Sequence, residues 1–170
     1  MPETTGTRFT TIKWVYLIIA LFGVLFLCLA SFFLFMMDAT VAIRAFVGGE
    51  GLWAKAQKDA VQSILSYAVS RDEADFLNYR RHIQVPLGDQ RTRIELQKEN
   101  PDMAVAREGL LQGRNHPKDI EYMIPFFSRF QHTAYLSKVI GHWTAGDAMI
   151  AELNRLAETL HDEIASGRNN

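Results

Sequence analysis

The chain of 170 residues contains a single cysteine and five prolines, and neither sign of charge is in excess. One cysteine cannot form an intramolecular disulfide, and Cys28 lies inside an apolar run, where a small apolar filler is the expected role. The 18 Lys and Arg residues against 19 Asp and Glu residues give a formal net charge of -1. This balance excludes a generally nucleic-acid-binding protein.

The sequence also lacks recognisable catalytic and metal-binding motifs. No serine stands in a nucleophile-elbow pattern, and Gly48, Gly49 and Gly51 lack the Lys-Ser or Lys-Thr that closes a phosphate-binding loop. No two histidines are three or four residues apart, the spacing that places two metal ligands on one helix face. No carboxylate is expected on an apolar helix face, where burial would raise its pKa. We therefore expect a protein that is not an enzyme, without a metal site or cofactor.

What the sequence does contain is one long apolar run, residues 14–37, with no charged side chain. As a helix at 1.5 Å per residue it would be about 36 Å long, against a hydrocarbon core of about 30 Å. Trp14 and Tyr16 stand at its start, where aromatic rings favour the headgroup level. The run ends Phe-Met-Met-Asp, without the small residues of a signal-peptide cleavage site. We expect it to cross the lipid bilayer once.

The charges beside this run indicate its orientation. The head, residues 1–13, carries Arg8, Lys13 and the terminal amine against one acidic residue, whereas the other flank has Arg44 and Lys55 with Asp38 and Glu50 nearby. The positive-inside rule therefore favours a cytoplasmic N-terminus by about one charge. Residues 38–170 would then form an extracytoplasmic domain, and the lack of disulfides favours a bacterial periplasm. The sequence thus predicts a single-pass protein of the bacterial inner membrane, with a transmembrane helix over residues 14–37.

Beyond the apolar run, the hydrophobic pattern is helical almost throughout. We expect the membrane helix to continue to about Val47, with the glycines at 48–51 interrupting it as a hinge. The next helix is expected at residues 52–69, and another from a capping box at Ser70 to about residue 84. After a break at Pro86, a helical piece should continue to residue 98. Three more helices are expected, from Pro101 to Gly109 or Gly113, from Pro117 to as far as Trp143, and from Gly146 to Ile164. The predicted fold is all-α, with an antiparallel bundle of about four long helices following the transmembrane helix.

Two of the expected helix boundaries gather basic groups. Arg114 and His116 flank a helix start, where free backbone N–H groups favour an anion, and Arg81 stands near the expected bend at Pro86. With Trp53 as an aromatic wall, these residues are the predicted ligand-binding set, and the predicted ligand is a small anion. The alternative is that His116 and its neighbour Asn115 only cap the helix while the arginines are solvated.

Four segments of the chain also carry a resemblance to a known group: VAIRAFVGGEGLWAKAQKDAV, VPLGDQR, GLLQGRNHPKDIEYMI and GHWTAGDAMIAEL. They resemble the extracytoplasmic helical input region of bacterial membrane-bound signalling proteins, and they cover most of residues 41–153. In that group the region lies between two membrane helices and feeds a GGDEF or EAL cyclic-di-GMP module or a histidine kinase. The resemblance implies a sensory function without fixing a ligand.

This chain departs from that group after Ile164, where neither a second apolar run nor an output domain follows. We expect an input fragment of a larger receptor, which detects an extracytoplasmic signal and passes it by helix movement to a cytoplasmic signalling output module. A tethered module that works alone is the other reading of the same ending. The alternative function is a single-pass scaffold whose helical domain binds another envelope protein. A buried polar pocket would favour sensing, whereas a large exposed apolar patch over a polar-free core would favour scaffolding.

The sequence next to the membrane also suggests self-association. Ala39, Ala42, Ile43 and Phe46 recur at near-helical spacing directly after the apolar run. Helical sensors commonly transmit by shifts of helices at a dimer interface. We therefore expect a homodimer formed through this segment.

Overall fold

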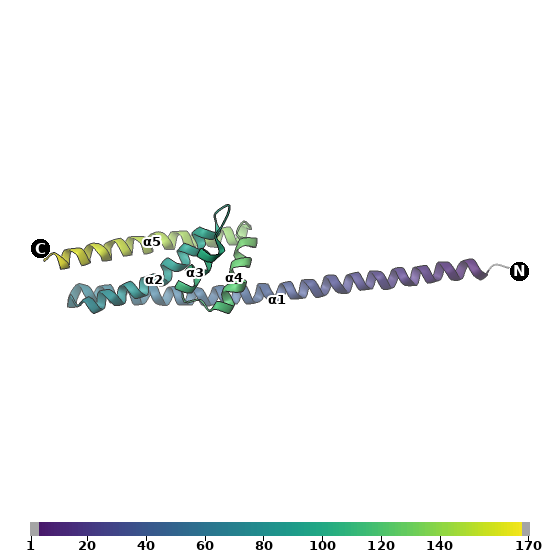
Figure 1. The fold of residues 1–170 in the computed structure, drawn as a ribbon, viewed down its shortest axis with the longest axis horizontal. Coiled ribbons are helices and arrows are strands. Elements are labelled where there is room, and N and C mark those ends of the chain that lie inside the picture. The colour runs from purple at the N-terminus through teal and green to yellow at the C-terminus, as the bar shows by residue number, and fades with distance from the viewer. Residues whose placement is uncertain (1–3, 168–170) are drawn as a thin grey trace. The chain divides into compact units, whose positions relative to one another are not determined.

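The computed structural model describes residues 4–167 and the side chains of residues 12–167, so residues 1–3 of the predicted cytoplasmic head lie outside the described part. Within the described residues the fold is all-helical and has no strand, which confirms the predicted class. The five helices are α1 (Thr4–Ser70), α2 (Glu73–Leu96), α3 (Met103–Gln112), α4 (Pro117–Phe130) and α5 (Ala134–Ala165) (Figure 1).

The chain divides into two compact units, residues 1–40 and residues 41–170. The described part of the first unit is the N-terminal portion of α1. Its large apolar side chains are exposed: Phe22, for example, keeps 66% of its surface and Phe26 keeps 69%. This is the one stretch of the described chain that is long and apolar enough to cross a membrane, and none of it is buried in the structure. It coincides with the run found in the sequence.

The predicted hinge at the glycines is wrong, because α1 continues through them as regular helix. Glycine costs about 1 kcal/mol in a helix interior, but tertiary packing supplies most of the stability of helices in proteins. Ala45 before the glycines and Ala56 after them are both buried against the rest of the unit. Packing on both sides therefore holds the helix across the glycines.

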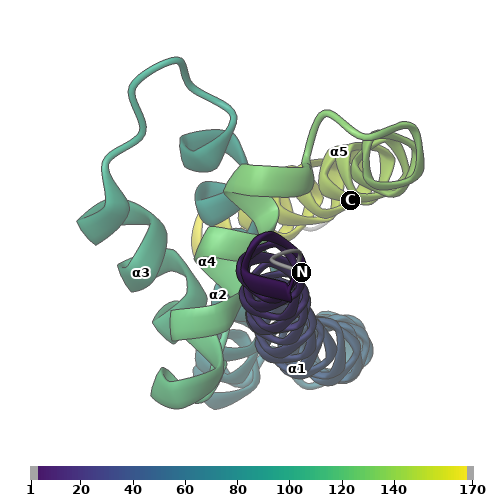
Figure 2. The ribbon, with the colours of Figure 1, turned by 90° about the vertical axis from the view of Figure 1, so that its right-hand side faces the viewer.

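In the second unit, the C-terminal part of α1 runs antiparallel to α2, and α2 runs antiparallel to α5. Tyr67 near the end of α1 lies against Phe76 near the start of α2, with ring centroids 5.2 Å apart. Tyr79 in α2 donates its hydroxyl hydrogen to Asn154 in α5 at 3.0 Å, and Arg93 farther along α2 reaches back to Asp147. The α2 helix lies between α3 and α5 in the end view (Figure 2).

Several helix boundaries differ from those predicted. The α2 helix starts after Asp72, whose side chain accepts a hydrogen bond from the Ala74 N–H at 2.9 Å, and not at Ser70. It continues through the expected break at Pro86, which is buried inside the helix. A buried proline is tolerated there because the neighbouring helices hold α2 over its full length, which local helix-breaking rules do not include.

The third helix is capped by Asp102 and begins at Met103 rather than at Pro101, and the fourth begins at Pro117 as predicted. The fourth helix does not reach Trp143, since it ends at Phe130 and α5 starts after Thr133, whose hydroxyl oxygen accepts from the Leu136 N–H at 3.4 Å. The described unit thus contains three long helical segments and two short ones, of 10 and 14 residues. The antiparallel arrangement of about four long helices stays a prediction.

Candidate functional site

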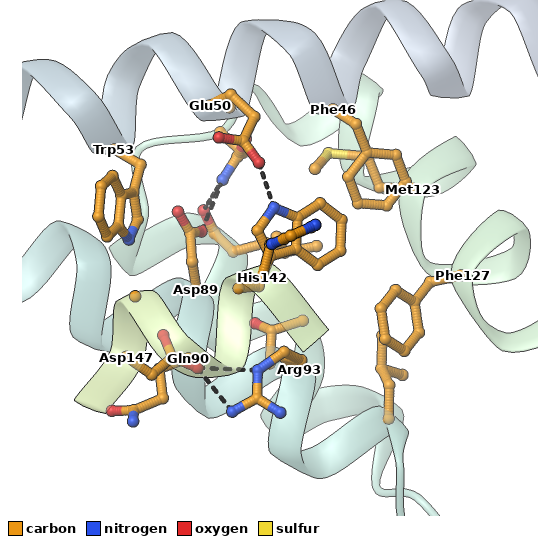
Figure 3. A pocket seen from close by; sticks show the side chains of 17 residues that line it. Phe46, Glu50, Trp53, Asp89, Gln90, Arg93, Met123, Phe127, His142 and Asp147 are labelled. Atoms are coloured by element: carbon orange, nitrogen blue, oxygen red, sulfur yellow. Dashed lines mark hydrogen bonds and ion pairs between the residues drawn. The ribbon is translucent and has the colours of Figure 1, made fainter. Parts of the chain in front are cut away.

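A cavity of about 390 Å³ lies inside the second unit. Its walls come from α1, α2, α4 and α5, together with Leu110 of α3 and Asn115 of the turn that follows it. Figure 3 shows side chains of these elements pointing into one space. Small-molecule sites in proteins commonly measure about 300–1,000 Å³, so the cavity is large enough for a small ligand.

Aromatic rings form much of the wall. They are Phe46 and Trp53 of α1, Phe127 of α4 and Trp143 of α5. Phe46 stacks on Trp143, with centroids 6.0 Å apart and planes 23° apart. Trp143 donates its indole N–H to the carboxylate of Glu50. These contacts fix the orientation of one indole, and Trp53 presents the other to the same cavity.

One buried ion pair crosses the cavity floor. Arg93 of α2 donates from Nε and Nη2 to Oδ2 of Asp147 in α5, at 2.8 and 2.6 Å. The side chains are only 12% and 9% exposed. Arg93 also donates from Nη1 to Gln97 at 2.6 Å. The charge of Arg93 is therefore already matched by Asp147 within the protein.

Asp89 of α2 is in a different position, because no basic side chain of the described residues pairs with it. Its Oδ1 accepts one hydrogen bond from Asn115 Nδ2 at 3.1 Å. Burial raises the pKa of Asp89 to about 8; the hydrogen bond from Asn115 acts in the opposite direction, while the negative charges of Glu50 and Asp147 raise the pKa further. The carboxyl group is thus largely protonated at neutral pH, and the expectation that no carboxylate stands on a buried helix face is wrong.

Two glycines make room for this carboxyl group. A Cβ atom at Gly113 would lie 2.1 Å from Asp89 Oδ1, and one at Gly49 would lie 2.8 Å from Asn115 Oδ1. Asn115 is itself buried and donates a further hydrogen bond to the Leu110 carbonyl oxygen at 3.1 Å. Side chains at either glycine would therefore displace the pair formed by Asp89 and Asn115.

Of the four residues predicted to bind a ligand, Trp53 lines the cavity and the other three do not. Arg81 is exposed and donates to Asn78 at 3.3 Å. Arg114 is exposed with a φ of 63°, and His116 caps α4, where its Nδ1 accepts from the Lys118 N–H at 3.2 Å. The capping alternative is confirmed for His116. The structure does not bring the predicted basic residues to Trp53.

Asp89, Arg93 and Asp147 were not predicted from the sequence, although the hydrophobic pattern contains a signal for the two aspartates. Asp147 falls seven residues after Ile140 and three before Ile150, which places it on the buried stripe of α5. Asp89 likewise stands four residues after the buried Val85 in α2. A charged residue that continues an apolar helical stripe is a candidate for a buried polar site.

Among the side chains that the structure describes, no group of three or more His, Cys, Asp or Glu residues is arranged to hold a metal ion. The cavity therefore offers aromatic walls, an internal ion pair and an unpaired carboxyl group. Comparison of the chain with protein-family models, with curated proteins and with solved structures finds no match.

Proposed function

We propose that this protein is a membrane-anchored sensory input domain whose helical unit, residues 41–170, binds a small molecule. The observation that carries the proposal is the cavity of about 390 Å³, in which aromatic walls surround a few buried polar groups. This combination is typical of small-molecule sites. Buried polar groups in a helical core also favour sensing over a scaffold with a polar-free core.

A ligand in this cavity would touch more than one helix. Phe46 and Trp53 belong to α1, whereas Trp143 and Asp147 belong to α5. A ligand shifts the balance between two helix arrangements when it binds one of them more tightly. Small helix shifts of about 1–2 Å are a common means of transmission. We propose that such a shift passes the signal to a cytoplasmic output module.

A ligand screen on the full chain in lipid nanodiscs tests the proposal, read as thermal stabilisation. Gly146 provides the matched variants, because a Cβ atom there would lie 3.6 Å from the Trp53 ring, an ordinary contact. Gly146→Ala should leave binding unchanged, whereas Gly146→Phe should fill the cavity and abolish stabilisation by any ligand found. If the screen finds no ligand whose stabilisation is abolished by Gly146→Phe, the proposed function is contradicted.

We further propose that the chain sits in the bacterial inner membrane with its N-terminus in the cytoplasm and residues 41–170 in the periplasm. The apolar part of α1 and the charge bias of the head support this topology. An alkaline phosphatase fused after Asn170 should be active, and one fused within the head should be inactive. The reverse pattern would overturn the orientation and leave the anchor in place.

The proposed homodimer needs a different face of α1 from the one first expected. Ala42 is buried within the helical unit and Phe46 stacks on Trp143, so neither is free for a second copy. Ile43 and Val47 are exposed, 54% and 68%, and lie on one face. Disulfide crosslinking of single cysteines placed along residues 38–47 should peak at positions 43 and 47. Equal crosslinking at 42 and 46 would contradict this face.

The alternative function, a scaffold for another envelope protein, has one feature in its favour. A shallow groove between α1 and α2 exposes Leu65 and Val69, which keep 63% and 87% of their surface. Under this alternative, Leu65→Glu would abolish partner capture, while Gly146→Phe would not affect it. Under the sensory proposal, Gly146→Phe would abolish ligand binding, while Leu65→Glu would not affect it.

A further inference from the structure

Granting the proposed function, we propose that the cavity takes an organic ammonium ion, with Asp89 as its counter-ion and Trp53 and Trp143 as its aromatic walls. The juxtaposition that carries this inference is a partly buried carboxyl group without a basic partner beside two indole rings in one cavity.

The charges that face the cavity favour a cation. Five titratable groups line it: Glu50 from α1, Asp89 and Arg93 from α2, and His142 and Asp147 from α5. Arg93 is neutralised by Asp147, to which it donates two hydrogen bonds of 2.8 and 2.6 Å. What remains is Asp89 and Glu50, which is exposed and accepts the Trp143 indole N–H, against one exposed histidine. An anion placed here would face these two carboxyl groups with no free arginine or lysine on the lining.

Asp89 also gives a cation a specific energetic role. A buried carboxylate without an opposite charge is costly, and a cation within about 4–6 Å favours its ionised form. Binding of an ammonium ion therefore promotes loss of the Asp89 proton to solvent, and the resulting ion pair is shielded from water. Its pKa of about 8 in the free protein makes this coupling strong near neutral pH.

The aromatic walls fit the remainder of such a ligand. Ammonium groups are attracted to the faces of aromatic rings, most strongly to tryptophan. Phe46 and Phe127 add apolar surface for the carbon skeleton. A small inorganic cation would leave these walls unused, and the described residues contain no cluster of three ligands for a metal ion. The geometry thus selects an organic cation.

The test uses three probes of similar shape and different charge: benzylammonium, benzyl alcohol and benzoate. Their affinities for the full chain in nanodiscs are measured by titration calorimetry at pH 8. We expect benzylammonium to bind at least about tenfold more tightly than benzyl alcohol, because only the cation gains the ion pair. Asp89→Asn should remove this preference. Asp162→Asn, an exposed carboxylate on α5, is the matched control and should retain it.

A pH series adds a second readout. Between pH 8 and pH 6, the affinity for benzylammonium should fall by up to about tenfold per pH unit, because binding must release the Asp89 proton. Glu50 and Asp147 oppose ionisation of Asp89, which keeps its proton in place until the ammonium ion binds. In Asp89→Asn this dependence of the affinity on pH should be lost.

The inference would be overturned if benzoate or benzyl alcohol bound as tightly as benzylammonium or more tightly. It would also be overturned if binding of benzylammonium were undetectable, or if Asp89→Asn still preferred benzylammonium to benzyl alcohol. The proposed function fails by a separate criterion. A neutral or anionic hit from the wider screen that is blocked by Gly146→Phe would leave the sensory function standing and remove only the ammonium ion. Such an anionic hit would match the ligand class expected from the sequence.

Discussion

The same three helices, α1, α2 and α5, build a closed core at one end of the helical unit and a cavity at the other. The closed end is packed by buried apolar and aromatic side chains, namely Ala60, Ile64, Tyr67, Phe76, Tyr79, Ile83, Ile150 and Ala157. The cavity end contains Asp89, Arg93 and Asp147 at the corresponding inward positions of α2 and α5. Where charged residues take the place of apolar ones on the inward-facing sides of α2 and α5, the helices enclose a cavity.

The two ends also differ in how their polar groups are satisfied. At the closed end, the Tyr79 hydroxyl donates to Asn154, and burial raises the pKa of Tyr79 so that it remains a neutral donor. His161 stacks on Phe76, with ring centroids 3.9 Å apart, and its Nε2 lies 3.1 Å from a Glu73 oxygen. At the cavity end, Asp89 has one donor and no counter-ion among the described residues. A counter-ion is therefore missing for a carboxyl group at the cavity end, whereas the polar groups named at the closed end pair with one another.

The largest effect is expected from opening the closed end. Tyr79 is fully buried, so Tyr79→Ala should lower the free energy of unfolding by roughly 3–5 kcal/mol. Tyr79→Phe keeps the ring and loses one hydrogen bond, so it should lower the free energy of unfolding by only about 1 kcal/mol. Denaturant unfolding followed by circular dichroism measures both. A loss below about 1 kcal/mol for Tyr79→Ala would show that this end does not hold the core.

Breaking the ion pair at the cavity end should have the next largest effect. Arg93→Met leaves Asp147 buried without its partner, and we expect a loss of roughly 3 kcal/mol in the free energy of unfolding. The double variant Arg93→Met, Asp147→Leu should recover most of this loss, because both charges are removed together. If the double variant is no more stable than Arg93→Met, the pair does not act as a buried unit.

An effect that depends on pH is expected at Asp89. The folded protein holds the pKa of Asp89 at about 8, above the ordinary 3.8, so the folded state binds this proton more tightly than the unfolded state. The stability that the protonated carboxyl contributes is present at acid pH and is lost as the pH rises from about 4 to about 8, at up to about 1.4 kcal/mol per pH unit.

Asp89→Asn should remove this slope and exceed the natural chain in stability near pH 8. Urea unfolding at pH 5, 6.5 and 8 gives the difference in free energy of unfolding between Asp89→Asn and the natural chain. Asp162→Asn is the control for loss of a carboxylate. A difference that does not change with pH would mean that Asp89 is solvated rather than buried.

The smallest effects concern the glycines of α1 beside the cavity. A Cβ atom at Gly48 meets nothing within 4 Å, so Gly48→Ala should raise the free energy of unfolding by about 0.5–1 kcal/mol through better helix propensity. Gly49→Ala should instead lower it by about 1 kcal/mol or more, since its Cβ would press on Asn115. Thermal unfolding of both variants measures the two changes in stability. Equal shifts would mean that a Cβ atom at residue 49 does not press on Asn115.

Local sequence rules succeeded where one residue decides the outcome. The Pro117 start of α4 follows from the preceding capping residue and the fixed φ of proline, and the apolar run of α1 follows from composition alone. They failed at Pro86, Gly48 and Gly146, all of which lie inside continuous helices. Packing from neighbouring helices outweighs a local cost of about 1–3 kcal/mol at such positions, and no single-sequence rule contains that term.

The amino-acid sequence alone determined the helical class, the apolar run in α1 and the stripes that form the closed core, because each depends on periodicity or composition along one segment. Only the tertiary structure decided the site. Asp89 and Asn115 are 26 residues apart and Arg93 and Asp147 are 54 residues apart, and their pairing depends on how α2 packs against its neighbours. The unusual pKa of Asp89 has the same origin, since desolvation comes from side chains that are distant in the sequence.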